Sequence, residues 1–214
     1  MKLLTVLSAV YCISFAKANT TWVPPKEHGT NLNLRTFLAT TGGIYTVLAT
    51  SETRRKLCKL DYNISFTDTQ VYITRNYTPG EEGPYEENLV GTFFDNPEVP
   101  TIMLLQTTDG ALRGAEQLVH QDDEHKCGIF FAVQKQIFAG QWYDSCELRV
   151  NSAHSPPMTY PECINDFIRI CDPEHILAQT VWPTFCVYIV SNPTGVKRAA
   201  TSKYVGQLYK IAQT

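Results

Sequence analysis

The chain has 214 residues, of which 43% are hydrophobic, 11% aromatic and 18% charged. This is enough apolar material for one substantial core, so the composition excludes a mostly disordered chain and predicts one domain with extensions. The 18 basic and 21 acidic residues give a net charge of −3, which excludes a general affinity for nucleic acid.

The N-terminus, residues 1–18, has the pattern of a secretory signal peptide. Lys2 precedes an apolar stretch that ends at Phe15, and the small residues Ala16 and Ala18 mark the cleavage position. The apolar stretch is too short to span a bilayer. We therefore expect a secreted, extracellular protein with no membrane insertion.

The cysteine count points to an oxidising compartment or a metal site, and the signal peptide favours the first. Cleavage would remove Cys12 and leave an even number of cysteines, which suits three disulfides: Cys58, Cys127, Cys146, Cys163, Cys171 and Cys186. Removing Lys2 and Lys17 leaves 16 basic against 21 acidic residues, a net charge of −5. Three N-glycosylation acceptors, at Asn19, Asn63 and Asn76, predict at least one glycan.

After an irregular lead, a short helix is expected from Asn33 to Thr40, and the pattern is then β. Segments rich in Val, Ile, Tyr, Phe and Thr, separated by Gly, Pro, Asp and Asn, are expected as strands. They are Ile44–Thr50, Leu57–Ser65, Thr69–Tyr77, Asn88–Phe94, Thr101–Thr107, Ala115–His120, Cys127–Gln134 and Asp144–Asn151.

A second helix is expected to begin at Pro161, a residue favoured in a first helical turn. Its apolar face is marked by residues at helical spacing: Cys163, Phe167, Ile170 and Cys171. Asp172-Pro173 ends it. The tail, residues 188–214, carries four basic side chains and no acidic one: Lys197, Arg198, Lys203 and Lys210.

Consecutive strands joined mostly by short loops, with one late helix, predict an all-β fold, an eight-stranded antiparallel up-and-down barrel. Such a barrel has room for one small ligand. A β-sandwich is the alternative, but it usually needs longer crossing connections than those visible here. The domain is expected to occupy residues 19–187.

Several pieces of the sequence resemble one known family in their order and spacing. They are Cys127-Gly-Ile-Phe-Phe-Ala-Val, Cys146-Glu-Leu-Arg-Val, Pro161-Glu-Cys163 with Phe167, and Cys186 after a Trp-Pro. Upstream, Thr36-Phe-Leu-Ala-Thr-Thr, Ile44-Tyr-Thr-Val-Leu-Ala-Thr and Cys58 resemble its entry helix, first strand and second-strand cysteine. Together they resemble the tick salivary lipocalins, the histamine-binding family. The resemblance implies a lipocalin barrel in which Cys58 pairs with Cys186 and Cys127 with Cys163, which leaves Cys146 with Cys171.

Alternation along a strand predicts which side chains face a ligand. If Cys146 points outward to the helix, Glu147 and Arg149 point into the barrel; if Cys127 points outward, Gly128, Phe130 and Ala132 point inward. In the family's amine binders, inward acids neutralise the ligand. By resemblance, Glu147 keeps an acidic position, whereas Gly128 replaces an Asp and Arg149 replaces an aromatic residue.

The inward Arg149 leaves three interpretations open. An amine about 5 Å from its charge, at an effective dielectric of ~20, would be repelled by roughly 3 kcal/mol, about a hundredfold in affinity. Arg149 could instead neutralise Glu147 as a buried pair, leaving an apolar cavity for a sterol or neutral lipid. It could also clamp the carboxylate of a leukotriene or fatty acid. If it lies in water at the barrel mouth, Glu147 remains free to meet an amine.

Other ligand-binding candidates are Tyr45 in the first strand and Glu87 before the fourth. Each of these side chains is more often scaffold or solvent-facing than part of a ligand site. His120 and His125 bracket an acidic turn that matches no metal site, so no metal and no cofactor are expected. The sequence has no set of nucleophile, base and orienting residue, so we do not expect an enzyme.

These observations predict a secreted salivary glycoprotein that sequesters a small-molecule ligand as a monomer. The resemblance implies a biogenic amine such as histamine or serotonin, captured to suppress host inflammation or haemostasis and so to evade host immunity. The alternatives are an acidic or neutral lipid mediator (leukotriene, fatty acid or sterol), or a protein-binding immune inhibitor that acts through the loops at the barrel mouth.

Overall fold

The computed structural model describes most of the predicted barrel and the helix that follows it. The described residues are 31–50, 56–79, 84–94, 96, 98–135, 140, 142–151, 161–171 and 179–180. The predicted signal peptide, the acceptor Asn19, the cysteine Cys186 and the basic tail lie outside these residues and stay predictions.

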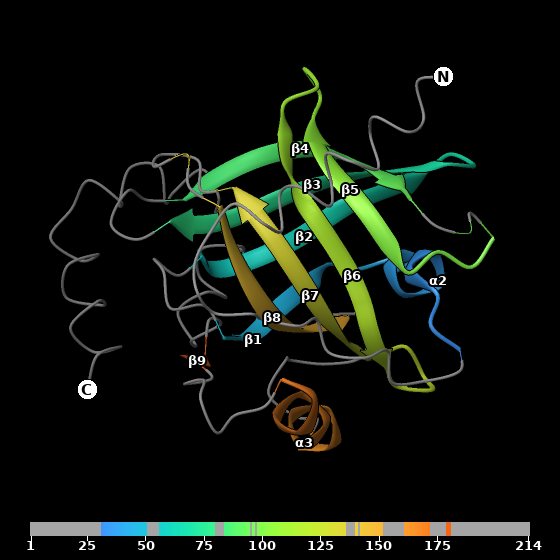
Figure 1. The fold of residues 1–214 in the computed structure, drawn as a ribbon, viewed down its shortest axis with the longest axis vertical. Helices are drawn as coiled ribbons and strands as arrows, with labels where there is room; N and C mark the ends of the chain where they lie inside the picture. Colours follow the sequence, from blue (N-terminus) through green and yellow to red (C-terminus); the bar gives the residue numbers. More distant parts are fainter. Residues whose placement is uncertain are drawn as a thin grey trace, which may run out of the picture.

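The prediction of an eight-stranded up-and-down barrel is confirmed, and every predicted strand is present (Figure 1). The strands are β1 Ile44–Ala49, β2 Lys56–Phe66, β3 Gln70–Pro79, β4 Tyr85–Phe93, β5 Ile102–Thr107, β6 Leu112–Gln121, β7 Cys127–Lys135 and β8 Trp142–Asn151. The largest differences from the predicted bounds are at the starts of β4 and β6, which begin three positions earlier, at Tyr85 and Leu112.

The sheet closes because β1 pairs on both sides. Tyr45 lies opposite Leu60 of β2 and opposite Val150 of β8. Each other strand of the barrel pairs antiparallel with its neighbour in sequence. Further along β1, a short strand that the sequence did not predict, β9 (Gln179–Thr180), pairs with Leu48 and Ala49. This closure excludes the β-sandwich alternative.

Helix α2 (Leu34–Leu38) covers one end of the barrel. Asn33 caps it by accepting a hydrogen bond from the Thr36 backbone N–H, and Arg35 ties it to the β2–β3 turn through the Thr67 and Asp68 carbonyls. The apolar side chains of the helix join an inner apolar cluster inside this end: Leu32, Leu34, Phe37, Leu38, Ile44, Val71, Ile73, Leu89, Phe93, Met103, Leu105, Leu118 and Phe130. The end covered by α2 is therefore closed by packed side chains.

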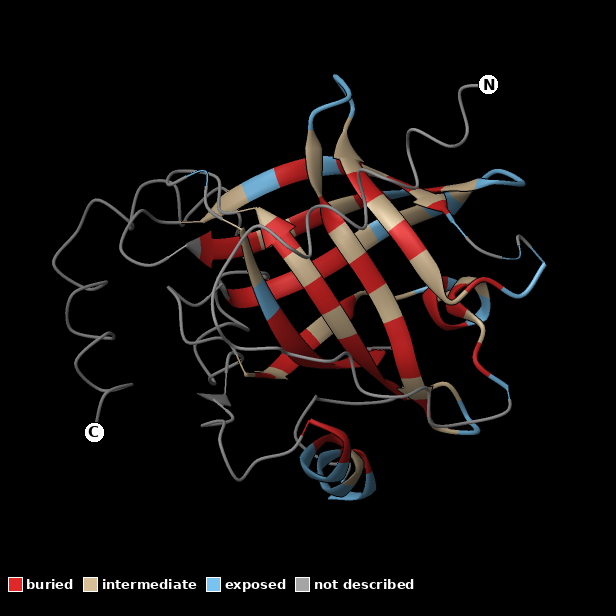
Figure 2. Ribbon diagram, viewed as in Figure 1, coloured by how far each residue is buried: buried red, intermediate tan, exposed pale blue. Residues whose placement is uncertain are grey.

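Helix α3 (Pro161–Ile170) lies against the outside of the barrel, next to β7 and β8. Its buried residues join an outer apolar cluster with strand residues such as Ile129 and Leu148. Buried and less buried residues alternate along much of β4 to β7, as Figure 2 shows, because one face of the wall meets the interior. No helix among the described residues is long and apolar enough to cross a membrane.

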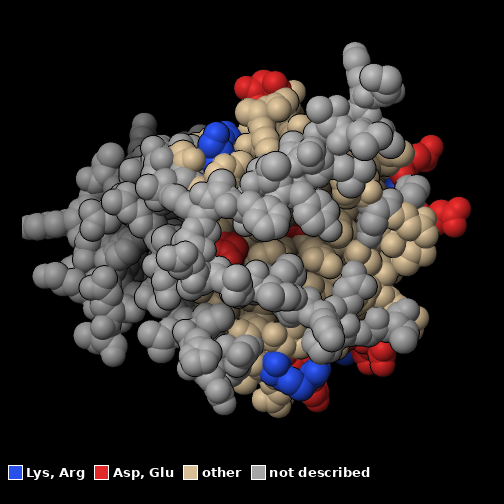
Figure 3. Space-filling view, viewed as in Figure 1, with Lys and Arg blue, Asp and Glu red and all other residues tan. Residues whose placement is uncertain are grey.

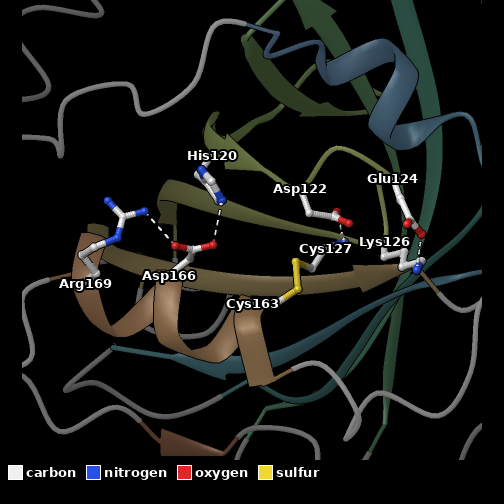
Figure 4. The surroundings of a disulfide bond; sticks show 8 residues. All are labelled: His120, Asp122, Glu124, Lys126, Cys127, Cys163, Asp166 and Arg169. Carbon is white, nitrogen blue, oxygen red and sulfur yellow. Dashed lines mark hydrogen bonds and ion pairs between the residues drawn. A yellow bond between two sulfur atoms is a disulfide. The ribbon is translucent and has the colours of Figure 1, made fainter.

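Two disulfides join α3 to the hairpin of β7 and β8, as the resemblance implied. Cys127 is bonded to Cys163, and Cys146 to Cys171. Beside the first bond, His120 of β6 lies 3.2 Å from the carboxylate of Asp166 on α3 (Figure 4). His120, which precedes the acidic turn, is therefore part of the attachment of this helix. Among the described residues, no three metal-binding side chains lie together.

Candidate functional site

Six charged side chains meet inside the barrel and form what we term the interior network. They are Lys59, Asp61, Arg75, Glu116, Glu147 and Arg149. None is more than 5% exposed. The network has three cationic and three anionic members, so its formal charge is zero. On the face shown in Figure 3, the charged side chains of the described residues lie mainly at the edges of the molecule.

Cross-strand register brings the network together. Asp61 of β2 lies opposite Arg75 of β3, and Arg149 of β8 lies opposite Gly128 of β7. Directly opposed residues in an antiparallel pair share one face of the sheet. In β2 the register shifts between Leu57 and Leu60, and Cys58 in this interval has φ 55°. We attribute the position of Lys59 to this bulge, because a bulge changes the phase of alternation.

Glu147 is the most densely hydrogen-bonded acid of the network. It accepts two hydrogen bonds from Lys59 Nζ, at 2.7 and 3.1 Å, and two from Arg149, at 2.6 Å from Nη2 and 2.9 Å from Nε. Gln134 Nε2 and Ser145 Oγ add donors at 3.1 and 3.3 Å. Both carboxylate oxygens therefore already have donors before any ligand arrives.

Glu116 connects the two arginines of the network. Its carboxylate accepts a 2.8 Å hydrogen bond from Arg75 Nη1 and a 2.6 Å bond from Arg149 Nη1. Arg75 also donates to both oxygens of Asp61, at 2.6 and 2.7 Å. Lys59 Nζ lies 3.6 Å from Glu116. Every member thus touches at least one partner of opposite sign.

The pKa shifts follow from burial and from these partners. Burial opposes ionisation of Glu147, but the charges of Lys59 and Arg149 outweigh it and lower the pKa to about 2. Burial likewise opposes the charge of Glu116, and Arg149, Arg75 and Lys59 hold its pKa well below the usual range. Burial, with repulsion from both arginines, lowers the pKa of Lys59. Glu147 and Glu116 are therefore ionised at neutral pH.

A second group of polar residues lies at the barrel end opposite α2, which we term the mouth group. It consists of Tyr77, Tyr85, Glu87 and Arg113. Tyr77 lies opposite Tyr85, and Glu87 opposite Arg75, so the group adjoins the interior network directly. Glu87 Oε2 lies 3.2 Å from Arg113 Nε. Burial, then the nearby Glu87 carboxylate, raise the pKa of Tyr77.

The structure brings together four of the five residues that the sequence suggested for ligand binding. Glu147 and Arg149 lie in the interior network, and Glu87 in the mouth group. Phe130 packs in the inner apolar cluster, 5.3 Å from the ring of Phe37 and 4.2 Å beneath the Arg149 guanidinium. Tyr45 does not join them, because it packs against the outer apolar cluster. A role in ligand binding stays a prediction for the first four.

The position of Arg149 excludes one of the three interpretations made from sequence. It is fully buried and paired with Glu147, so the interpretation that it lies in water at the mouth is wrong. Gly128 is also explained, because a Cβ there would lie 2.9 Å from Phe37 and 3.0 Å from Leu118. The position that resembles a family aspartate thus leaves room for side chains of the inner cluster.

Sequence reasoning missed four network residues: Lys59, Asp61, Arg75 and Glu116. The signal for Arg75 was present, since it continues the inward alternation of Val71 and Ile73 along β3. Glu116 likewise precedes the inward Leu118 by two positions. A charged residue at an inward position of an otherwise apolar strand is the pattern that would have identified both.

Of the remaining predicted residues, Asn63 is exposed on β2 and Asn76 is half-buried on β3. Their glycosylation stays a prediction. Cys58 is buried, and because Cys186 lies outside the described part of the chain, their pairing also stays a prediction.

No family model matches the sequence, and no curated protein is similar to it in sequence. Solved structures do share the fold. Lobster apocrustacyanin A1 is 16% identical over 81% of this chain and 98% of its own, with a TM-score of 0.50. H1 crustacyanin from the lobster Homarus americanus is 16% identical over 83% of this chain and 100% of its own, with a TM-score of 0.49. The siderocalin Ex-FABP is 13% identical over 66% of this chain and 88% of its own, with a TM-score of 0.46.

At these identities the likeness shows the fold alone. The closed up-and-down barrel of eight antiparallel strands is a lipocalin fold, shared with apocrustacyanin A1. The neighbours do not support membership of the tick salivary subfamily, which rests on the resemblance described above.

Proposed function

We propose that this protein is a secreted lipocalin that captures one small, electrically neutral ligand, such as a sterol or another neutral lipid. The ligand enters at the barrel end opposite α2 and lies against the mouth group. Capture is stoichiometric, with no chemical turnover. The observation that carries the proposal is that Glu147 is already neutralised by Lys59 and Arg149 inside a network of zero formal charge.

A neutral network disfavours either sign of ligand charge. An ammonium group has no free carboxylate at Glu147, and to use that acid it must displace Lys59 or Arg149. A ligand carboxylate has no free guanidinium, because Arg149 is held by Glu116 and Glu147. Breaking a buried ion pair by removing one partner typically costs about 3–5 kcal/mol. A neutral ligand avoids this cost.

A biogenic amine such as histamine or serotonin remains the ligand class that the family resemblance implies. The acid preserved at Glu147 supports an amine ligand, whereas the pairing of Glu147 with two cations argues against one. Secretion in saliva and suppression of host inflammation or haemostasis also rest on the resemblance. The buried disulfides add support for an extracellular location, because such bonds persist in oxidising compartments.

A protein-binding immune inhibitor is the other alternative carried over from sequence. It requires a filled barrel and an apolar patch on the mouth loops. Those loops include residues 51–55, 80–83 and 136–139, which lie outside the described residues.

The test is a calorimetric titration of the secreted, disulfide-intact protein at neutral pH with cholesterol, histamine and arachidonic acid in turn. We expect cholesterol to bind and the two charged probes to bind about a hundredfold or more weakly, because each has to break a buried pair. The variant Glu147→Gln is titrated in parallel, with Glu86→Gln as the matched control, since Glu86 is exposed. Tight histamine binding that is lost in Glu147→Gln and kept in Glu86→Gln would restore the amine interpretation.

A further inference from the structure

We infer that Glu87 and Arg113 form a hydroxyl-binding site at the barrel mouth, and that the ligand is therefore a lipid alcohol. The inference rests on the proposed function and specifies the polar group by which a neutral ligand is recognised. Three observations support it: the burial of the pair, the geometry of its facing atoms and the bulge that places Arg113.

The facing atoms of this pair are close, buried and incompletely satisfied. Glu87 Oε2 and Arg113 Nε lie 3.2 Å apart, and the two side chains are 6% and 24% exposed. Within the described part of the chain, neither of these two atoms has a hydrogen bond of acceptable geometry, although the Glu87 carboxylate also interacts with the nearby Tyr77 hydroxyl and, after burial, helps to raise the pKa of that tyrosine. The N–H is therefore not directed at the carboxylate. A buried polar atom without a hydrogen bond is costly, so native proteins usually provide a partner.

A β-bulge accounts for the position of Arg113. Leu105 of β5 lies opposite Gly114, but the next residue, Gln106, lies opposite Leu112, so Arg113 is the extra residue of β6. Strict alternation from the inward Gly114 would turn Arg113 outward, away from Glu87. Bulges redirect single side chains and occur often beside functional sites. This bulge brings a cation of β6 into contact with Glu87 of β4, the strand on the other side of β5.

The chemistry of the pair selects a hydroxyl group. The carboxylate oxygen accepts hydrogen bonds only and the guanidinium N–H donates only. A hydroxyl both donates and accepts. One hydroxyl oxygen can therefore donate to the Glu87 carboxylate and accept from the Arg113 N–H while the ion pair stays intact. An ether can only accept, and an ammonium group can only donate. A ligand carboxylate would also face repulsion from Glu87.

The surroundings fit an apolar body attached to that hydroxyl. The rings of Tyr77 and Tyr85 lie beside the pair, with centroids 5.5 Å apart and planes tilted by 48°. Below the pair lies Arg75 of the interior network, directly opposite Glu87. We therefore expect the hydroxyl to point toward the network and the hydrocarbon to lie along the tyrosines toward the barrel end opposite α2.

The experiment uses probes with one alkyl chain and different head groups: dodecanol, its methyl ether, dodecylamine and dodecanoic acid. Each is titrated calorimetrically into the secreted, disulfide-intact protein. We expect dodecanol to bind about tenfold or more tightly than the ether, because the ether leaves the carboxylate oxygen without a donor. This comparison needs no variant, so it does not depend on whether a mutant folds.

The double variant Glu87→Leu/Arg113→Met removes both charges together. We expect it to bind dodecanol and the ether equally. The control Glu86→Leu/Arg169→Met makes the same chemical change at exposed positions, and should keep the preference for the alcohol. Equal binding of alcohol and ether by the wild-type protein, or a preference that survives in the double variant, would overturn the hydroxyl site while leaving a neutral ligand in place. Tightest binding of dodecylamine or dodecanoic acid, or no binding of any probe, would overturn the proposed function as well.

Discussion

Arg149 and Glu147 lie two residues apart on β8 and are joined inside the barrel by hydrogen bonds of 2.6 and 2.9 Å. Residues at this spacing point to the same face of a strand, so the contact is built into the local geometry. From other strands, Glu116 accepts a further hydrogen bond from Arg149, and Lys59 donates one to Glu147. The pair therefore belongs to the scaffold of the interior, and a ligand is expected to lie above it.

The first prediction concerns the coupling of this pair. Glu147→Gln leaves Lys59 and Arg149 one negative charge short in a buried site, and we expect it to lower the free energy of unfolding by about 3–5 kcal/mol. Arg149→Met should have a similar cost. In the double variant the remaining network is neutral again. Its loss in free energy of unfolding should therefore be smaller than the sum of the two single losses by at least about 1 kcal/mol. Urea unfolding with disulfides intact measures all three.

Glu86→Gln serves as the control for these variants, because this exposed acid should change the free energy of unfolding by less than about 0.5 kcal/mol. Additive losses in the double variant would show that Glu147 and Arg149 do not act as a pair in solution.

The second prediction is a loss of stability in acid. The pKa of Glu147 is lowered from 4.5 to about 2 in the folded protein. As the pH falls below 4.5, the unfolded chain binds this proton first, so protonation favours unfolding. The contribution of Glu147 should be complete above about pH 4.5 and disappear as the pH approaches 2, with a slope of up to about 1.4 kcal/mol per pH unit. Urea unfolding at a series of pH values measures it.

The same acid titration of Glu147→Gln provides the comparison. Its stability should fall less steeply over this interval, although Glu116 still contributes because its pKa is also lowered. Parallel curves for the two proteins would contradict the assignment of the lowered pKa to Glu147.

The third prediction concerns Gly128 beneath α2. A Cβ at this position would lie 2.9 Å from Phe37 and about as close to Leu118 and Phe130. Gly128→Ala should therefore lower the free energy of unfolding by about 1–3 kcal/mol through overpacking. Gly128→Asp should cost more, because it also buries a carboxylate among apolar side chains. Amide hydrogen exchange of α2 should rise in both variants, and unchanged exchange would show that the helix does not rest on this position.

The fourth prediction concerns the attachment of α3. The bonds Cys127–Cys163 and Cys146–Cys171 close segments with sequence separations of 36 and 25 residues. Replacing both cysteines of one bond with serine should lower the free energy of unfolding by about 2–5 kcal/mol. We expect amide exchange of α3 to rise moderately in either double variant and strongly when both bonds are removed. If exchange stays low without the bonds, the outer apolar cluster and His120–Asp166 alone hold the helix.

Part of the site could be read from the sequence. Because side chains alternate along a strand, an outward Cys146 implies that Glu147 and Arg149 point inward. The same reasoning starting from Ile73 would have found Arg75. Lys59 was harder to find because the bulge at Cys58 interrupts the alternation. Tyr45 was expected inside and lies with the outer cluster, since a resemblance in sequence does not fix the phase of a strand.

The sequence by itself determined the barrel, because alternating apolar residues and short polar turns leave an antiparallel sheet few other ways to bury one face. The family resemblance, rather than the pattern of residues, implied which cysteines bond to α3. Only the tertiary structure decided that the interior charges cancel, because Glu116, Arg75 and Asp61 come from separate strands that meet only once the sheet closes. Electrostatic energy depends on distance through space, and the order of residues along the chain does not specify it.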